Sequence, residues 1–387
     1  MQKVYMAKCC RTPIGSPAGS LSNMAEKDIL AEAVRALLNK ADIPGRKIGA
    51  ELNDFVAGCC FSQEPHSYAK KALVSAGIPA NIPAVCIGRT CASSMEALII
   101  ASRNIIIGAA DVILVGGTEN MSQSPYSLKN AYMNIKNSTK TLNDLRDASY
   151  LDNIGLAVET AAREYGISRN KQDDYSVKSY EKARYAQKNG WFKDEIEPVR
   201  LADNTIFNED EHIQFYKHLL DSEKNVPLFC EDGTITKKNA TSINDGASAV
   251  LLMSERACEK YGIQPEAEII SSVVIGVDPG SICLAPHKAF NKLLDISGIK
   301  EDDIDLIECN EAYAAQMCIC LKQSKWNPEI INIGGGSIPL GHPLGSTGLR
   351  ICITLLHHLK RNSVAYGVAV LCGGGGIGSG VLIKNLT

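Results

Sequence analysis

The sequence predicts an α/β protein with parallel strands in its core, and three observations support this class. Apolar stretches of strand length alternate with amphipathic stretches of helix length before residue 120, and the alternation resumes after residue 243. Glycine-rich turns follow several of the apolar stretches, where they allow close approach of backbone. At 387 residues, the chain is long for one domain and suits two or three core units.

The first part of the chain alternates strand and helix. A strand that ends at the turn Thr12–Gly15 is followed by a segment whose apolar residues recur at helical spacing. The glycines of GGTENMSQSP at 116–125 are expected to follow the last strand of this part. The expected elements are strands at residues 3–10, 54–60 and 111–115 and a helix at 25–40.

The stretch VCIGRTCASSMEALIIASRNIII, residues 85–107, is the centre of this part of the chain. After Cys91 the segment is apolar nearly all round, which predicts a buried helix with Thr90 or Ser93 as its N-cap. A cysteine at a helix N-terminus meets the positive end of the helix dipole, which favours the nucleophilic thiolate. The alternative is an ordinary buried cysteine, since the chain has fourteen cysteines.

Residues 126–240 differ from their surroundings because they are polar and rich in Lys, Asn, Asp and Tyr. A long helix is expected at 169–189, stopped by Gly190, and the acidic stretch 203–215 is expected to be a surface loop. This composition predicts an inserted lid or arm that lies outside the core.

The last part of the chain repeats the layout of the first. A strand leads through a loop that carries a reactive candidate into a buried helix, as it does around Cys91. The core resumes at 243–254, and a strand at 304–307 leads into ECNEAYAAQ. Residues 331–359 predict a strand, a turn and a helix. Residues 368–385 predict a strand, a glycine turn and a returning strand.

Composition excludes several classes of function. The formal net charge of −3 gives no support for binding nucleic acid or an anionic membrane surface. The chain start has no apolar signal-peptide core, and no apolar run reaches transmembrane length. The many cysteines predict free thiols in a reducing, cytoplasmic compartment. No pair has the C-x-x-C spacing of a zinc site, and no metal is expected.

Glycine motifs for nucleotide binding do not apply. Gly373, Gly375 and Gly378 match G-x-G-x-x-G, but the residues that follow predict a strand and not the helix that a dinucleotide pyrophosphate requires. No phosphate-binding G-K-[ST] loop is present in the sequence.

Three further residues are candidates for chemistry, each with a simpler alternative. His342 lies in the rigid GHPLG loop before a helix, which suits a ring that must be aimed, although a lone histidine is often structural. Asn310 lies at a strand end, where it could equally be a helix cap. Cys372 ends an apolar strand before four glycines, whose unshielded N–H groups are what an oxyanion hole needs.

Taken together, these motifs resemble the thiolase family. The blocks, in order, are RTPIGSPAGSL, CASSMEAL, GGTENMS, NATSINDGASA, NEAYAAQ, GGGSIPLGHPLGSTGLR and LCGGGGIG. The resemblance covers residues 3–385. It implies a five-layered αβαβα fold of two similar halves, with an inserted loop domain that binds coenzyme A. The domains it implies are 1–118 with 243–268, 119–242 and 269–387.

The resemblance also implies a role for each motif residue. Cys91 matches the nucleophile that becomes acylated, and His342 matches the base that takes its proton. Cys372 matches the acid/base that exchanges a proton with the substrate α-carbon. Asn310 matches the residue that holds a catalytic water, and Gly374 matches the second N–H of an oxyanion hole that includes the Cys91 N–H.

Coenzyme A is implied as a substrate and not as a permanent cofactor, with Thr241, Ser242, Gln214 and Tyr313 as its contacts. Several positions depart from the family pattern. Cys-Ala-Ser-Ser replaces the usual Cys-Gly-Ser-Gly at residues 91–94, Thr241 replaces serine, and Gln214 stands where many members carry arginine. Lys217 and Lys224 could partly replace that arginine.

The resemblance thus implies an acyltransferase that joins two acetyl-CoA into acetoacetyl-CoA or cleaves 3-ketoacyl-CoA, in fatty acid metabolism. It further implies a homo-oligomer, a dimer or a tetramer. One alternative is a decarboxylating condensing enzyme of the same fold, against which Cys372 argues because those enzymes lack the second cysteine. Another is a divergent thiolase-like protein with weak activity, or a scaffold.

Overall fold

The computed structural model describes residues 2–41, 48–124, 150–215 and 226–387. The first half of the core contains the expected strands and helices, one strand being longer than expected, and two short helices that were not expected. They are β1 Val4–Arg11, α1 Glu26–Ala41, β2 Asp54–Gly58, α2 Tyr68–Ser75, β3 Ala84–Ile87, α3 Ser93–Ile106, β4 Val112–Asn120, β7 Asp245–Ser254 and α8 Glu255–Tyr261.

The second half of the core has the same succession of elements. They are β8 Ala267–Gly276, α9 Ala285–Ser297, β9 Leu306–Cys309, α10 Ala314–Ser324, α11 Ser337–Leu340, α12 Leu344–Asn362, β10 Tyr366–Gly373 and β11 Ile377–Asn385. The repeat that the sequence indicates is therefore visible element by element, with α12 in the place of α3 and β10 in the place of β4.

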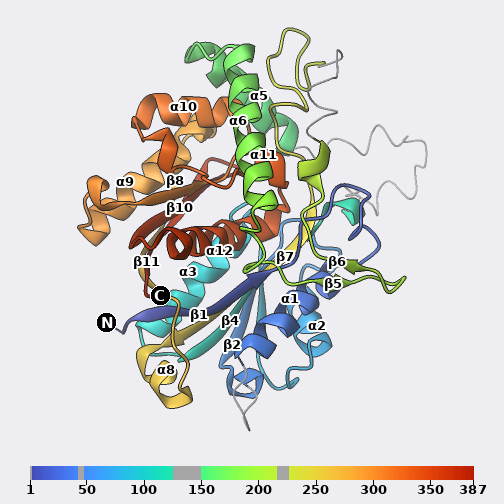
Figure 1. Ribbon diagram of the computed structural model, residues 1–387, viewed down its shortest axis with the longest axis vertical. Coiled ribbons are helices and arrows are strands. Elements are labelled where there is room, and N and C mark those ends of the chain that lie inside the picture. Colours follow the sequence, from blue (N-terminus) through green and yellow to red (C-terminus); the bar gives the residue numbers. More distant parts are fainter. Residues whose placement is uncertain (1, 42–47, 125–149, 216–225) are drawn as a thin grey trace, which may run out of the picture.

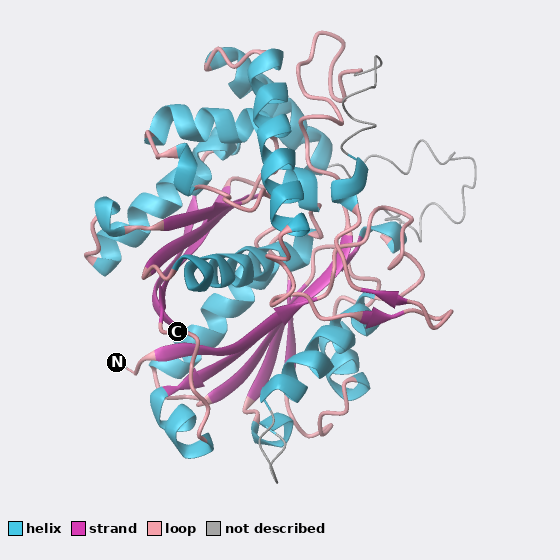
Figure 2. Cartoon of the chain, viewed as in Figure 1, coloured by secondary structure: helices cyan, strands magenta, loops and turns pink. Residues whose placement is uncertain are grey.

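One nine-stranded sheet runs through both halves in the order β3-β2-β4-β7-β1-β8-β11-β10-β9. The two halves are joined only weakly, because β1 pairs with β8 over two residue pairs, Tyr5–Glu268 and Met6–Ala267. In Figure 1 the strands accordingly form two fans, with α3 and α12 between them. Figure 2 shows further helices on the outer side of each fan.

The apolar side chains of the strands alternate between these layers. Phe55 and Leu114 pack with α1 and α2 on the outer face of the first half. Val56 and Ile113, their chain neighbours, instead pack with α3 and α12 in the middle layer. Val370 of the second half packs outward on α9. The result is helix, sheet, paired helices, sheet, helix, which confirms the five-layered fold.

The expectation of a parallel core is only partly right. β2 is parallel to β3 and β4, and β9 is parallel to β10, but the other neighbouring pairs of the large sheet are antiparallel. The last strand of each half returns beside its predecessor, as in the β10–β11 hairpin. Gly375 and Gly376 make that turn at φ +85° and +81°, a backbone region that glycine adopts without strain.

Two element boundaries differ from the expectation. The strand expected at 111–115 continues to Asn120, because Gly116 and Gly117 remain within β4. These glycines are required by packing: a Cβ on Gly117 would lie 2.4 Å from the Cβ of Ser94. The strand expected near residue 331 is reduced to a single bridge between Ile307 and Ile331, after which Asn332 turns the chain at φ +44°.

The polar middle region forms helices that pack on the second half. Its described elements are α5 Tyr150–Glu164, α6 Arg169–Lys188, β5 Val199–Arg200, β6 Ile206–Phe207 and the 3₁₀ helix η4 His212–Phe215. The side chain of Ser168 caps α6 at the N–H of Lys171, and α6 packs on α10 and α11. The acidic stretch 203–215 contains β6, which pairs with β5, and η4 in addition to loop.

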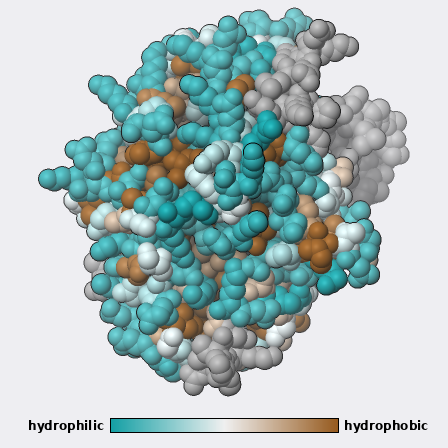
Figure 3. Space-filling model, viewed as in Figure 1, coloured by the Kyte–Doolittle hydropathy of each residue, from teal (hydrophilic) through white to brown (hydrophobic). Residues whose placement is uncertain are grey.

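The surface is largely polar. Figure 3 shows a face on which hydrophilic residues predominate and hydrophobic residues form smaller separate areas. Among the described helices, none combines the length and apolar character that crossing a bilayer requires.

Candidate active site

Cys91 lies in the tight turn between β3 and α3. The hydroxyl of Ser93 donates to the carbonyl of Thr90 at 2.6 Å and accepts the N–H of Arg89 at 2.9 Å. Thr90 has φ +46°, an uncommon conformation for a residue with a Cβ. The expectation of a side-chain cap is wrong, because Ala92 is the N-cap residue and Ser93 tightens the turn before it. The turn holds Cys91 at the start of the buried helix.

The thiol of Cys91 is not activated in the resting protein. Burial raises its pKa to about 12, and the carboxylate of Glu119 adds to the effect. The backbone N–H groups of Cys91 and Gly374 lower the pKa of the thiol but do not compensate. The N–H group at the start of the helix thus favours thiolate, as expected, but desolvation and a carboxylate from a distant strand outweigh its effect.

Gly374 lies in the β10–β11 turn, directly against the Cys91 turn. The hydroxyl of Thr90 lies 3.5 Å from the carbonyl of Gly374, and a Cβ on Gly374 would come within 3.1 Å of Ile154 and 3.4 Å of Thr90. The sulfur of Cys91 thus faces two backbone N–H groups, its own and that of Gly374. Two converging N–H groups can stabilise an oxyanion on a carbonyl bonded to this sulfur.

Cys372 is the second thiol of the site and is only 5% exposed. It lies on β10, two residues before Gly374. Burial is the main cause that raises its pKa well above the usual value, and the neighbouring thiols of Cys91, Cys283 and Cys320 raise it further. Cys372 is therefore a protonated thiol at neutral pH, close enough to Cys91 that a thiolate on Cys91 would raise the pKa of Cys372.

His342 is held in one tautomer by its neighbours. Its Nδ1 lies 2.7 Å from the hydroxyl of Thr347, and that hydroxyl donates its proton to the carbonyl of Pro343 at 2.9 Å. Because a hydroxyl has a single proton, Nδ1 must be the donor to Thr347. The buried Nε2 has no hydrogen-bond partner among the described residues, so its lone pair is available to accept a proton.

The surroundings of His342 keep it neutral. Burial lowers its pKa to about 3, and the positive charge of Arg350 adds to the effect. Its backbone N–H donates to Asn244 Oδ1 at 3.0 Å, and the carboxamide of Asn244 in turn donates to the carbonyl of Gly15. Gly341 is required here, since its φ is +100° and a Cβ would lie 2.5 Å from Asn244.

Asn310 is fully buried at the end of β9, and its side chain is held from one side. Ser337 donates its hydroxyl proton to Asn310 Oδ1 at 2.6 Å and accepts Nη2–H of Arg350 at 2.7 Å. This fixes the orientation of the amide and leaves Nδ2 as a buried donor without a partner among the described residues. A free donor of this kind can hold a water. Sequence reasoning did not identify Ser337 and Arg350 as functional.

Glu119 is a second residue that sequence reasoning missed. Its carboxylate is fully buried and accepts the N–H groups of Cys60, Phe61 and Gly345 at 2.9, 2.9 and 2.7 Å. It thereby joins the end of β4 to the loop after β2 and to the first turn of α12 beside His342. Glu119 is the single acidic residue of the GGTENMS block, and this was the sequence signal that could have identified it.

The residues expected to contact coenzyme A are distributed over several parts of the structure. Thr241 donates to the carbonyl of Ser337 at 2.8 Å, which brings it beside the Asn310 cluster. Tyr313 precedes α10 and packs edge-on against Phe229, with ring centroids 6.0 Å apart. Ser242 donates to Asn244 Oδ1 at 2.6 Å, so its hydroxyl supports the His342 loop.

Gln214 stands apart from the other expected contacts. It is exposed on η4, and its side chain makes no hydrogen bond with another part of the chain that the structure describes. Lys217 and Lys224, expected as partial substitutes for an arginine here, lie outside the described residues. The described residues also contain no group of three or more His, Cys, Asp or Glu side chains that could hold a metal ion.

The chain matches two domain families over nearly its whole length: "Thiolase, N-terminal domain" over residues 4–256 and "Thiolase, C-terminal domain" over residues 263–385. It is 37% identical to an acetyl-CoA acetyltransferase of Shinella zoogloeoides, covering 97% of each chain. It is 36% identical to one of Chromobacterium violaceum, covering 99% of this chain and all of the relative.

Solved structures agree in fold as well as in sequence. The acetyl-CoA acetyltransferase of Bacillus anthracis superposes with a TM-score of 0.91 at 31% identity, covering all of this chain and 99% of that one. Human mitochondrial 3-ketoacyl-CoA thiolase in complex with CoA gives 0.89 at 30% identity, covering all of this chain and 98% of that one. The match of both domains, together with the layered fold, shows that the chain belongs to the thiolase family of acyltransferases.

Proposed function

We propose that the protein catalyses the reversible Claisen condensation of two acetyl-CoA into acetoacetyl-CoA and CoA, and the thiolysis of 3-ketoacyl-CoA, through an acetylated Cys91. The observation that carries this proposal is the arrangement at Cys91. Its sulfur meets the N–H groups of Cys91 and Gly374, and the protonated thiol of Cys372 is its neighbour. A nucleophile, an oxyanion hole and a separate proton donor are thus available together.

In the thiolysis direction the first step uses both thiols. Cys91 gives its proton to Nε2 of His342 while its sulfur attacks the 3-keto carbon, and the N–H groups of Cys91 and Gly374 stabilise the oxyanion. The bond between C2 and C3 then breaks. The enolate oxygen accepts hydrogen bonds from His342 and from a water on Nδ2 of Asn310, and the enolate carbon takes the proton of Cys372.

The second step begins after the first acetyl-CoA has left, and it restores both thiols and the neutral histidine. The thiol of coenzyme A gives its proton to the Cys372 thiolate and attacks the acetyl group on Cys91. The bond between the acetyl carbon and Cys91 breaks, and the Cys91 sulfur recovers its proton from His342. Acetyl-CoA leaves, and both cysteines are again thiols, as their raised pKa values require. Condensation is the same sequence in reverse.

The test is thiolysis of acetoacetyl-CoA by coenzyme A, followed by loss of the enolate absorbance. We expect turnover by the wild type and none by the Cys91→Ala variant. A decarboxylating condensing enzyme would consume malonyl-CoA and leave acetoacetyl-CoA uncleaved. A scaffold protein would bind acyl-CoA without turnover. Either result would contradict the proposal.

We propose domains at 1–118 with 243–268, 119–242 and 269–387, the middle one binding coenzyme A through Thr241, Ser242, Gln214 and Tyr313. We also propose a homotetramer, because the apolar strand β3 lies at the sheet edge with Val85 40% exposed. We propose a cytoplasmic location, because free cysteines are typical of a reducing compartment. We also propose a role in fatty acid metabolism, because the reaction joins and cleaves acyl-CoA. Light scattering after size-exclusion chromatography tests the assembly.

A further inference from the structure

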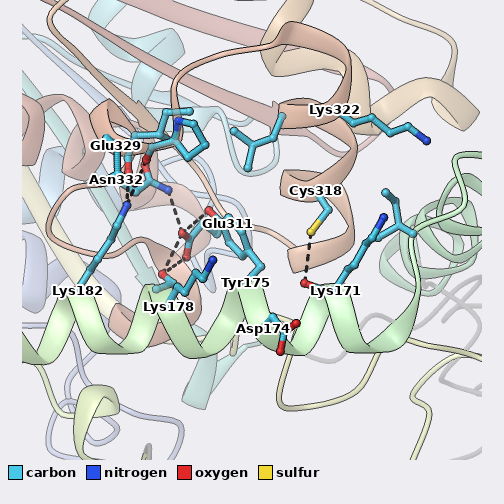
Figure 4. Close-up of a pocket in the computed structure, with 15 residues that line it drawn as sticks. Lys171, Asp174, Tyr175, Lys178, Lys182, Glu311, Cys318, Lys322, Glu329 and Asn332 are labelled. Carbon is cyan, nitrogen blue, oxygen red and sulfur yellow. Dashed lines mark hydrogen bonds between the residues drawn. The ribbon is translucent and has the colours of Figure 1, made fainter.

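A pocket of about 570 Å³ lies between α6 and α10, away from the Cys91 turn. One stripe of α6 forms one wall, two turns of α10 form the opposite wall, and residues 328–332 close one end (Figure 4). The volume lies in the range of small-molecule sites. Tyr175 and Cys318 lie between its two ends, and Ile167 and Leu321 add apolar lining, so the pocket is largely apolar.

The polar groups at the base of the pocket are already engaged with one another. The Glu311 carboxylate is fully buried and accepts the hydroxyls of Tyr175 and Ser179 at 2.8 Å and the amide of Asn332 at 3.0 Å. It also accepts the N–H of Ile338 at 3.1 Å. The base therefore offers no free polar group for a ligand and favours an apolar body above it.

Lysines lie toward both ends of this apolar middle. Figure 4 shows Lys171 and Lys322 toward one end and Lys178 and Lys182 toward the other. Lys182 donates to the carbonyl of Ile331 at 2.9 Å, and Lys322 donates to the carbonyl of Tyr165 at 2.7 Å. These two ammonium groups are fixed in position by backbone.

The other two lysines of the pocket are Lys171 and Lys178. Within the described residues, the ammonium groups of Lys171 and Lys178 make no ion pair and no hydrogen bond, although Asp174 lies between them on the same face of α6. Counting Asp174, Glu311 and Glu329 as negative, the lining carries four positive and three negative charges. A partly enclosed apolar surface with unpaired cations at its ends attracts an anion that has an apolar body.

The pocket is separate from the proposed acyl-CoA site. Glu311 directly follows Asn310, and its carboxylate, with Ser179 and Asn332, forms the wall between the pocket and the buried Asn310 cluster. The expected coenzyme contacts Thr241 and Tyr313 do not line this pocket. A ligand here would bind behind the catalytic asparagine and not in front of it.

We propose that this pocket is a second ligand site that binds an organic monocarboxylate with a hydrocarbon body. The body packs on Tyr175, Cys318 and the other apolar lining of the pocket, and the carboxylate pairs with Lys171 or Lys178 at an end of the pocket. Binding needs no acyl transfer, so the proposal stands or falls independently of the activity.

Titration calorimetry of the full-length protein with sodium octanoate tests the site, at constant ionic strength maintained with sodium chloride. Octan-1-ol has the same apolar body without the charge, and inorganic phosphate has charge without the body. We expect octanoate to bind, octan-1-ol to bind at least ~3-fold more weakly, and phosphate not to bind, since one ion pair to an exposed lysine contributes up to about 1 kcal/mol.

The Lys171→Gln, Lys178→Gln double variant removes the two free cations without breaking any ion pair of the described structure. We expect it to weaken octanoate binding at least ~3-fold, the effect of one ion pair to an exposed lysine. The matched control is Lys188→Gln with Lys193→Gln, which removes the same charge from exposed lysines outside the pocket. Its affinity should stay within ~2-fold of the wild type.

Cys318 reports occupancy without any substitution, because it lines the pocket. Its alkylation by iodoacetamide at alkaline pH, measured by peptide mass spectrometry, should slow at saturating octanoate. Alkylation of Cys230, which lies outside the pocket, should not change. Absence of binding at millimolar octanoate, equal affinity in the lysine double variant, or unchanged alkylation of Cys318 at saturation would each overturn the proposal.

Discussion

Nδ1 of His342 lies 2.7 Å from Oγ1 of Thr347, whose own proton is donated to the carbonyl of Pro343. This contact places a proton on Nδ1 and leaves Nε2 as an acceptor. Removing the hydroxyl should release the ring from that tautomer and orientation. We expect Thr347→Val to lower kcat of thiolysis by ~10-fold, a part of the ~100- to 10,000-fold that a general base contributes.

The control for this prediction is Thr347→Ser, which keeps the hydroxyl and should retain most of the wild-type kcat. KM for acetoacetyl-CoA should change little in either variant, because Thr347 is fully buried behind the histidine. Equal activity of the valine and serine variants would show that the hydroxyl does not position His342.

The protonation state of Cys91 makes a prediction about pH. With its pKa raised to about 12, the free thiol predominates at neutral pH, and the thiolate fraction increases as pH rises toward 12. Alkylation by iodoacetamide requires thiolate. Its rate at Cys91 should therefore rise by about tenfold per pH unit from pH 7 through pH 9 without levelling off.

The low pKa of His342, about 3, has a related consequence: a resting thiolate–imidazolium pair is strongly disfavoured. Proton transfer from Cys91 to His342 must then accompany attack on the substrate. An alkylation rate at Cys91 that reaches its plateau near pH 7, as a preformed ion pair would give, is the result that would refute this view.

Cys372 is predicted to act on the α-proton and not on the acyl group. In Cys372→Ala, acetylation of Cys91 by acetyl-CoA should survive, since the leaving group is the thiolate of an ordinary thiol and can depart without the proton that Cys372 gives it. Condensation and thiolysis should fall by at least ~100-fold, the usual loss for a general acid/base. The two half-reactions are separated by mass spectrometry of the acyl-enzyme and by steady-state assay. A similar loss in both would contradict separate roles for the cysteines.

Gln214 tests the proposed contact with the coenzyme phosphates. An arginine can bind phosphate through two parallel hydrogen bonds, which neutral glutamine cannot. We expect Gln214→Arg to lower KM for acetoacetyl-CoA by ~10-fold, or about 1.4 kcal/mol, with kcat nearly unchanged, because a remote contact serves substrate and transition state alike. Gln214→Lys is the control for charge alone and should give a smaller gain. An unchanged KM in both variants would mean that this exposed position does not reach the phosphates.

Local patterns predicted much of the fold, because strand and helix periodicity is a short-range property of the sequence. Helix α3 and the β10–β11 hairpin appear where the apolar runs and glycines indicated them. The antiparallel direction of β7 could not be predicted from local patterns, because it depends on how the chain returns after the polar middle region.

The candidate site could likewise be predicted only in part. The motifs indicated Cys91 and Gly374, and the structure brings their N–H groups to one sulfur. The charge state of that sulfur could not be predicted from the Cys91 stretch, because the opposing carboxylate, Glu119, comes from the end of β4. The support of Asn310 by Ser337 likewise joins residues 27 positions apart.

The central claim is that Cys91 carries the acetyl group. Incubation of the wild-type protein with acetyl-CoA, followed by acid quench and peptide mass spectrometry, measures this directly among the fourteen cysteines. We expect one acetyl group per chain on Cys91, removed again by added coenzyme A, and none on Cys372. Acetyl on another cysteine with Cys91 unmodified would contradict the account.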